Sequence, residues 1–187
     1  PNRLPTDVPD FNYIRFTEKH DEIIAATELC DADELTRLRA VNPLVHVLTN
    51  EVVQEITANV LLAAGAAPAM IVAEEEVTPL PAMSGALLIN VGTLYPARLA
   101  VMRQAIASAN AAGVPWTLDP VAVGVLDYRS DACREFLDAG PAAIRGNGSE
   151  ILALAGCAGG GRGVDTTTGS EAAIEAAVQL SRQTGAV

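Results

Sequence analysis

Asp119, Arg145 and Glu150 are the residues of this sequence whose types best suit a metal-bound polyphosphate. Mg²⁺ in proteins prefers one or two carboxylates together with phosphate oxygens, so Asp119 and Glu150 suit a hydrated Mg²⁺ ion. Arg145 is one of few cations in an acidic chain, and the forked donors of arginine suit phosphate groups. Each residue also has a purely structural interpretation. Asp119 then caps the turn after it, Glu150 favours a helix N-terminus, and Arg145 pairs with a neighbouring acid.

The placement of these residues in the expected fold favours a site. Short apolar runs predict buried strands at residues 44–48, 69–73, 86–91, 115–119 and 142–145. Helical patterns lie between them, which predicts a three-layer α/β fold with a mostly parallel sheet covered on both faces. Ligands in such folds bind beyond the carboxyl ends of the strands. Polar residues follow those ends repeatedly: Thr49 and Asn50, Asn90 and Gly92, Asp119 and Pro120, and Arg145, Gly146 and Asn147.

Three longer helices are predicted at residues 51–64, 96–112 and 170–184, each followed by a glycine. Pro96 suits the first turn of the second helix. Their apolar faces consist of Val52, Ile56, Val60 and Ala64 in the first, Leu99, Met102, Ile106 and Ala109 in the second, and Ile174 and Val178, expected to point inward, in the third. A shorter helix is expected after Asp31, which has the spacing of a capping box with Glu34. Ala186 and Val187 would begin another strand, so the chain is expected to stop inside a βα pattern.

The composition excludes several classes of protein. The 187-residue chain carries a net charge of -11 and no basic stripe, which argues against nucleic-acid binding. No run reaches the ~18 apolar residues of a membrane helix. Cys30, Cys133 and Cys157 are odd in number and widely separated, so we expect reduced thiols and a cytoplasmic protein.

Several common motifs are missing or weak. The only lysine is Lys19, so there is no P-loop, and no G-x-G-x-x-G follows the first strand. The glycine-rich run at 159–163 reads as a flexible connection rather than a ligand loop. His20 and His46 lie too far apart for a zinc site, and His46 is expected to be an ordinary sheet residue.

Six ordered strings resemble the hydroxyethylthiazole kinase family, whose members have a ribokinase-like fold. The resemblance covers about residues 42–187, and residues 1–41 show no match. The strings are PLVHVLTN (43–50), GAAPAM (65–70), LINVGTL (88–94), WTLDPVAVG (116–124), IRGNGSE (144–150) and GRGVDT (161–166). On this basis residues 42–187 would be the N-terminal part of a kinase domain, and residues 1–41 a tail with a short helix.

The resemblance implies a kinase that transfers the ATP γ-phosphoryl group to 4-methyl-5-(2-hydroxyethyl)thiazole in thiamine biosynthesis or salvage. The family roles fall on Met70, Asn50 and Val52 for the thiazole, on Arg145 and Asn147 for ATP, and on Asp119 and Glu150 for Mg²⁺. The resemblance also implies a homotrimer with active sites between subunits.

The sequence departs from the family pattern at its end, because the Gly-Thr-Gly-Cys loop that holds the transferring phosphate is not present. No catalytic residue is therefore assigned. Two alternatives stay open: an inactive fragment that only binds ligand or self-associates, and a kinase for a related heterocyclic alcohol.

Overall fold

A computed structural model describes residues 31–156, 161–162, 165–166 and 170–187. The chain divides into two compact units, Pro1–Val41 and Asn42–Val187. In the first unit the described part is the helix α2 (Asp31–Val41), where a short helix was predicted. The tail predicted at 1–27, the thiols of Cys30 and Cys157, and residues 159, 160 and 163 of the glycine-rich run lie outside the described residues.

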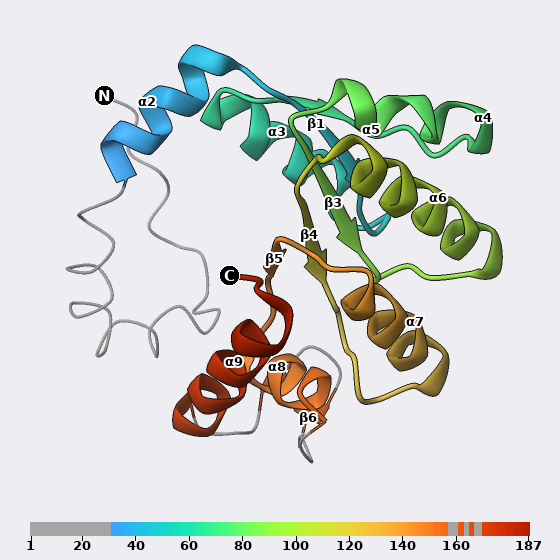
Figure 1. The fold of residues 1–187 in the computed structure, drawn as a ribbon, viewed down its shortest axis with the longest axis vertical. Coiled ribbons are helices and arrows are strands. Elements are labelled where there is room, and N and C mark those ends of the chain that lie inside the picture. Colours follow the sequence, from blue (N-terminus) through green and yellow to red (C-terminus); the bar gives the residue numbers. More distant parts are fainter. Residues whose placement is uncertain (1–30, 157–160, 163–164, 167–169) are drawn as a thin grey trace, which may run out of the picture. The chain divides into compact units, whose positions relative to one another are not determined.

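A five-stranded parallel sheet forms the centre of the second unit and confirms the predicted fold class (Figure 1). The strands are β1 (Leu44–Leu48), β2 (Ala67–Ala69), β3 (Ala86–Asn90), β4 (Trp116–Asp119) and β5 (Ala143–Ile144), in the order β2-β1-β3-β4-β5. The register pairs Asn90 with Asp119 at the carboxyl ends of β3 and β4.

The second strand was predicted at 69–73, and this was wrong. β2 pairs with β1 only from Ala67 to Ala69. Beyond it, the carbonyl of Ile71 accepts a hydrogen bond from the His46 side chain at 2.9 Å instead of from a backbone amide. The chain has therefore left the sheet, and it enters α4 (Glu74–Val77) at Glu74.

Val187 lies beside β5. Its amide donates to the carbonyl of Ala142 at 3.1 Å, and its carbonyl accepts from the amide of Ile144 at 2.9 Å. These two bonds have the pattern of a parallel ladder, which agrees with the strand expected to begin at Ala186 and Val187.

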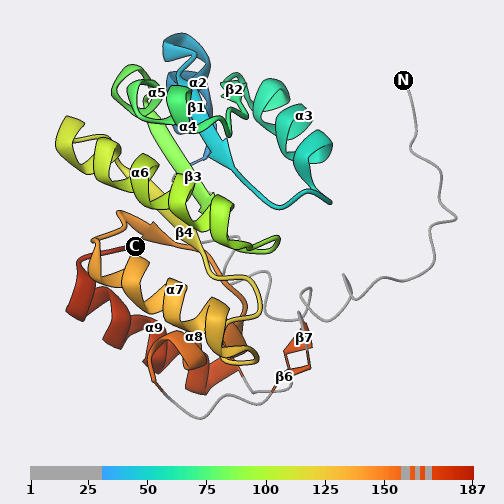
Figure 2. The same ribbon diagram turned by 90° about the vertical axis from the view of Figure 1, so that its right-hand side faces the viewer.

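Helices connect the strands and flank the sheet. Besides α4 they are α3 (Gln54–Ala64), α5 (Pro79–Met83), α6 (Pro96–Ala112), α7 (Asp127–Asp138), α8 (Gly148–Leu154) and α9 (Ser170–Thr184). β6 (Gly161–Arg162) and β7 (Asp165–Thr166) form a separate antiparallel pair. Figures 1 and 2 show α6 and α7 side by side along the sheet. No helix among the described residues is long and apolar enough to cross a membrane.

α6 has the predicted bounds and the predicted buried face. Pro96 lies in its first turn, and Gly113 ends it in the left-handed conformation at φ 68°. The face packs into the main core together with Ile89, Trp116, Leu118 and Phe136. Its members are Leu99, Met102, Ile106 and Ala109, all buried.

The apolar faces expected on the other two helices do not enter the core. α3 has no buried residue, and Ile56 and Val60 are 62% and 60% exposed. From residue 173 onward the buried residues of α9 are Ala176 and Leu180, whereas Ile174 and Val178, expected to point inward, are 60% and 43% exposed. The physical reason in α9 is that the helix packs on α8, and the side that is buried is the neighbouring i, i+4 stripe of Ala176 and Leu180.

Candidate functional site

Four polar side chains form a continuous hydrogen-bonded row across the carboxyl ends of the strands. The Asn50 amide nitrogen donates to Oδ1 of Asn90 at 3.1 Å. The Asn90 amide nitrogen donates to Oδ2 of Asp119 at 2.8 Å, and Nη1 of Arg145 donates to the same oxygen at 3.0 Å. The parallel sheet produces this row because it places the carboxyl ends of β1, β3, β4 and β5 at one edge, and the four residues lie at or just beyond those ends. The structure thus brings together three sequence-predicted site residues, Asn50, Asp119 and Arg145.

Asp119 has the features of a cation ligand. It is only 5% exposed, and among the described residues its Oδ1 atom is buried without a hydrogen-bond partner. Buried carboxylate oxygens are seldom left unsatisfied because their desolvation is costly. An Mg²⁺ ion or its water shell would satisfy this oxygen, so Asp119 fits the metal that the resemblance implies. The described residues hold no cluster of three or more His, Cys, Asp or Glu side chains around one point. A site with one or two carboxylates is the arrangement that Mg²⁺ commonly uses.

Glu150 braces two backbone segments. Its Oε2 accepts from the amide of Asn147 at 2.9 Å, while Oδ1 of Asn147 accepts from the amide of Glu150 at 3.0 Å, which makes a capping box at the start of α8. Its Oε1 accepts from the amide of Ala122 at 2.8 Å. Ala122 has φ 55°, a conformation that costs free energy in a residue with a side chain. Both carboxylate oxygens are therefore engaged by the protein, and Glu150 fits a metal less directly than Asp119 does.

The turn after β1 carries two of the three residues predicted to bind an alcohol substrate. Oδ1 of Asn50 accepts from the amides of Val52 and Val53 at 3.1 and 3.2 Å, so this side chain shapes its own turn. Val52 is 91% exposed. Met70 is half-buried and follows β2, the strand next to β1.

Gly92 leaves the space in which the side chains of Asn50 and Asn90 meet. A Cβ atom at this position would lie 2.8 Å from Cβ of Asn50 and 3.0 Å from Oδ1 of Asn90. Its amide donates to that Asn90 oxygen at 2.9 Å. Any side chain here would push Asn50 away from Asn90.

The sequence placed Asn90 at the candidate edge without a specific role, and the structure makes it an inner member of the row. Arg98 and Arg129 were not predicted. Arg129 donates to the carbonyls of Val121 at 3.0 Å and Gly92 at 3.3 Å, and so joins the loops after β3 and β4. No signal in the sequence distinguishes these arginines from exposed ones on the same helices.

Two other reactive side chains lie away from solvent. Burial raises the pKa of the Cys133 thiol to about 12, which leaves it protonated and a poor nucleophile. Burial also lowers the pKa of His46, although its hydrogen bond to the Ile71 carbonyl acts in the other direction. His46 is completely buried in β1, in keeping with an ordinary sheet residue.

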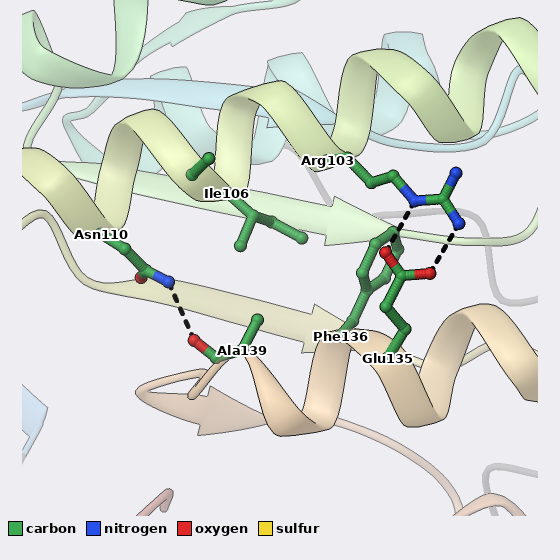
Figure 3. A pocket seen from close by; sticks show the side chains of 7 residues that line it. Arg103, Ile106, Asn110, Glu135, Phe136 and Ala139 are labelled. Atoms are coloured by element: carbon green, nitrogen blue, oxygen red, sulfur yellow. Dashed lines mark hydrogen bonds and ion pairs between the residues drawn. The ribbon is translucent and has the colours of Figure 1, made fainter.

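A surface pocket between α6 and α7 is separate from the row (Figure 3). Its volume is about 320 Å³, and Ile106 and Phe136 contribute to its lining. Arg103 and Glu135 pair across it through two hydrogen bonds of 2.6 Å. None of its lining residues belongs to the row, so it is not part of the candidate site.

A model of the hydroxyethylthiazole kinase family matches residues 35–187, so the match begins within α2. The hydroxyethylthiazole kinase of Citrobacter koseri is 58% identical over 156 residues, which cover 83% of this chain and 60% of that protein. The hydroxyethylthiazole kinase of Escherichia coli O9:H4 is 59% identical over 146 residues, 78% of this chain and 56% of that protein. The chain thus spans about 60% of the length of these relatives.

The fold is similar to that of a solved hydroxyethylthiazole kinase protein from Pyrococcus horikoshii OT3. The TM-score is 0.67 and the sequence identity 38%. The similarity covers 80% of this chain and 54% of that structure.

Proposed function

Because this chain belongs to the hydroxyethylthiazole kinase family, we propose that the protein transfers the γ-phosphoryl group of ATP to the hydroxyl group of 4-methyl-5-(2-hydroxyethyl)thiazole. The observation that carries this proposal is the row from Asn50 to Arg145. One end of the row is a neutral amide that suits a small polar substrate. The other end pairs a buried carboxylate with an arginine, which suits a metal-bound polyphosphate.

The charges in this proposal serve positioning and neutralisation, which are the main requirements of phosphoryl transfer. The Arg145 side chain is 79% exposed although its Nη1 contacts Asp119, so its remaining donors are available to ATP phosphates. Asn147 follows two residues later and would lie on the same side. Asp119 would hold Mg²⁺ through its free Oδ1, with Glu150 as the second acid. Bound there, Mg²⁺ would supply positive charge to offset the negative charge of the ATP phosphates.

We also propose that residues 42–187 form the N-terminal part of a kinase domain and residues 1–41 a tail with a short helix. The boundary between the two compact units at Asn42 supports this division, whereas the family match begins at residue 35 and so includes the last seven residues before that boundary. The proposed location is the cytoplasm, where ATP is available. Cell fractionation should recover the protein together with cytoplasmic enzymes.

Self-association, with a trimer as the proposed state, is supported by the exposed apolar face of α3. Ile56 and Val60, one turn apart on this face, are 62% and 60% exposed, and Val52 just before the helix is 91% exposed. Contiguous exposed apolar patches are typical of interfaces. This face continues directly from the turn that carries Asn50, so a second copy docked there would lie next to the proposed alcohol side.

Ile56→Glu combined with Val60→Glu is expected to weaken self-association at least about 100-fold, because each glutamate would be buried without a partner. Sedimentation velocity over a concentration series measures this. Ala111→Glu, at an exposed position of α6, is the control and should leave the oligomer unchanged. An oligomer that persists in the double variant would rule out this face as the interface.

An assay coupled to ADP release tests the function. The full-length gene product with Mg-ATP is expected to phosphorylate the thiazole alcohol, and the 187-residue chain is assayed beside it. Faster turnover of another heterocyclic alcohol would reassign the substrate. An absence of turnover with every alcohol would refute the kinase proposal.

A further inference from the structure

Arg98 is a buried arginine beside the turn that carries Asn50. It lies in the first half of α6, and its side chain is only 4% exposed. Its Nη2 atom donates to the backbone carbonyl of Thr49. Its Nη1 atom lies 3.8 Å from Oε1 of Glu51. One guanidinium thus reaches the residues on both sides of Asn50.

The burial of Arg98 needs an explanation, because an arginine on a helix normally extends its charge into solvent. Among the described residues its Nε atom is buried without a partner, so the site does not satisfy the whole group. The cost of burying a charge is tolerated where the charge fixes another element. Here that element is a turn of non-repetitive backbone, whose carbonyls have no ladder partners.

The loop between β3 and α6 makes further contacts with the turn after β1. The amide of Glu51 donates to Oγ1 of Thr93 at 3.1 Å. Gly92 leaves space for Asn50, which in turn holds the amides of Val52 and Val53. The loop after β3 and the start of α6 therefore form a scaffold on which the turn rests. Arg98 is the member that spans both flanks of Asn50.

We propose that Arg98 is a positioning residue for the alcohol substrate. It acts through the backbone of Thr49 and through Glu51 to hold Asn50 in the row, and it does not contact the substrate itself. This assignment rests on the proposed function, in which Asn50 binds the alcohol. It concerns the alcohol side of the site and leaves the ATP side, at Arg145, unaffected.

Arg98→Met in the full-length gene product is expected to raise the KM for the thiazole alcohol about 10- to 100-fold, the range for loss of a buried hydrogen bond from a charged group. The KM for ATP should change less than about twofold. Arg98→Lys retains the charge and one donor and should give an intermediate KM. Arg103→Met is the matched control, because Arg103 lies on the same helix but pairs with Glu135 at the surface (Figure 3). An alcohol KM in Arg98→Met equal to that of Arg103→Met would overturn the proposal, as would a parallel rise in both KM values.

Amide hydrogen exchange of the 187-residue protein tests the positioning separately from the reaction. Arg98→Met should speed exchange at Glu51, Val52 and Val53, whereas Arg103→Met should not. If Arg98→Met does not fold, Glu51→Gln replaces it, since Glu51 is 59% exposed and its loss should leave the fold intact. That variant should speed the same exchange and raise the alcohol KM about two- to fivefold; unchanged values for both would overturn the proposal. If wild type phosphorylates no alcohol, the proposed function fails, and exchange alone then decides whether Arg98 holds the turn.

Discussion

Asp119→Asn is expected to lower kcat/KM of the full-length gene product about 10²- to 10³-fold, the usual effect of removing one preorganised electrostatic group. The change keeps the shape of the side chain and leaves an oxygen that can still accept from Asn90 and Arg145. It removes the negative charge and replaces one carboxylate oxygen by an NH₂ group, which donates hydrogen bonds and does not bind a cation. The fold should therefore survive, whereas binding of the metal–nucleotide complex should not. Calorimetric titration with Mn²⁺ and an ATP analogue measures that binding directly.

The control for this prediction is Asp131→Asn. Asp131 is an exposed aspartate that pairs with Arg134 one turn along α7, and its side chain is 70% exposed. Surface pairs of this kind contribute little, so activity and melting temperature should stay close to wild type. If Asp119→Asn kept more than a third of wild-type activity, the row would not be the phosphate side of the site.

The position of the site follows from the sequence because strand ends can be predicted. Apolar runs end abruptly at Asn50, Asn90 and Asp119, and parallel pairing then places those residues at one edge. The order of contacts along the row was not predictable. It depends on the register of β3 against β4 and on the absence of a side chain at Gly92.

Which side of a helix is buried could be predicted from the sequence only for α6, which covers the central strands of the sheet. The stripe of α6 is buried in the main core as expected, because this helix connects two central strands, β3 and β4. α3 follows β1 at the side of the sheet where β2 is the edge strand, and its stripe stays exposed. α9 offers two neighbouring stripes, and periodicity alone does not say which of them meets α8. α7 was not predicted, because its buried face consists of small or single apolar residues such as Ala132, Cys133 and Phe136.

A polar residue at the start of a helix can cap the helix or bind a ligand, and sequence spacing alone does not distinguish these two roles. The structural alternative for Glu150 was that it only favours a helix N-terminus, and the structure shows it in a capping box with Asn147. The structure adds that the same carboxylate reaches Ala122 in the loop after β4. The residue therefore links the start of α8 to the loop that follows Asp119, which no local pattern could indicate.

Glu150→Ala is accordingly expected to destabilise the protein by about 2–4 kcal/mol, because two partly buried backbone amides lose a charged acceptor. A mere helix-dipole effect would be about 0.3–1 kcal/mol. Asp127→Ala is the matched control, since Asp127 is an exposed acid in the first turn of α7. Chemical denaturation measures both variants. Equal losses of unfolding free energy in Glu150→Ala and Asp127→Ala would mean that Glu150 only interacts with the helix dipole. A much larger loss of stability in Glu150→Ala would show that Glu150 holds the loop after β4. Activity should then fall as well, because Ala122, at φ 55°, can relax once its hydrogen bond to Glu150 is lost. The backbone that follows Asp119 would move with it.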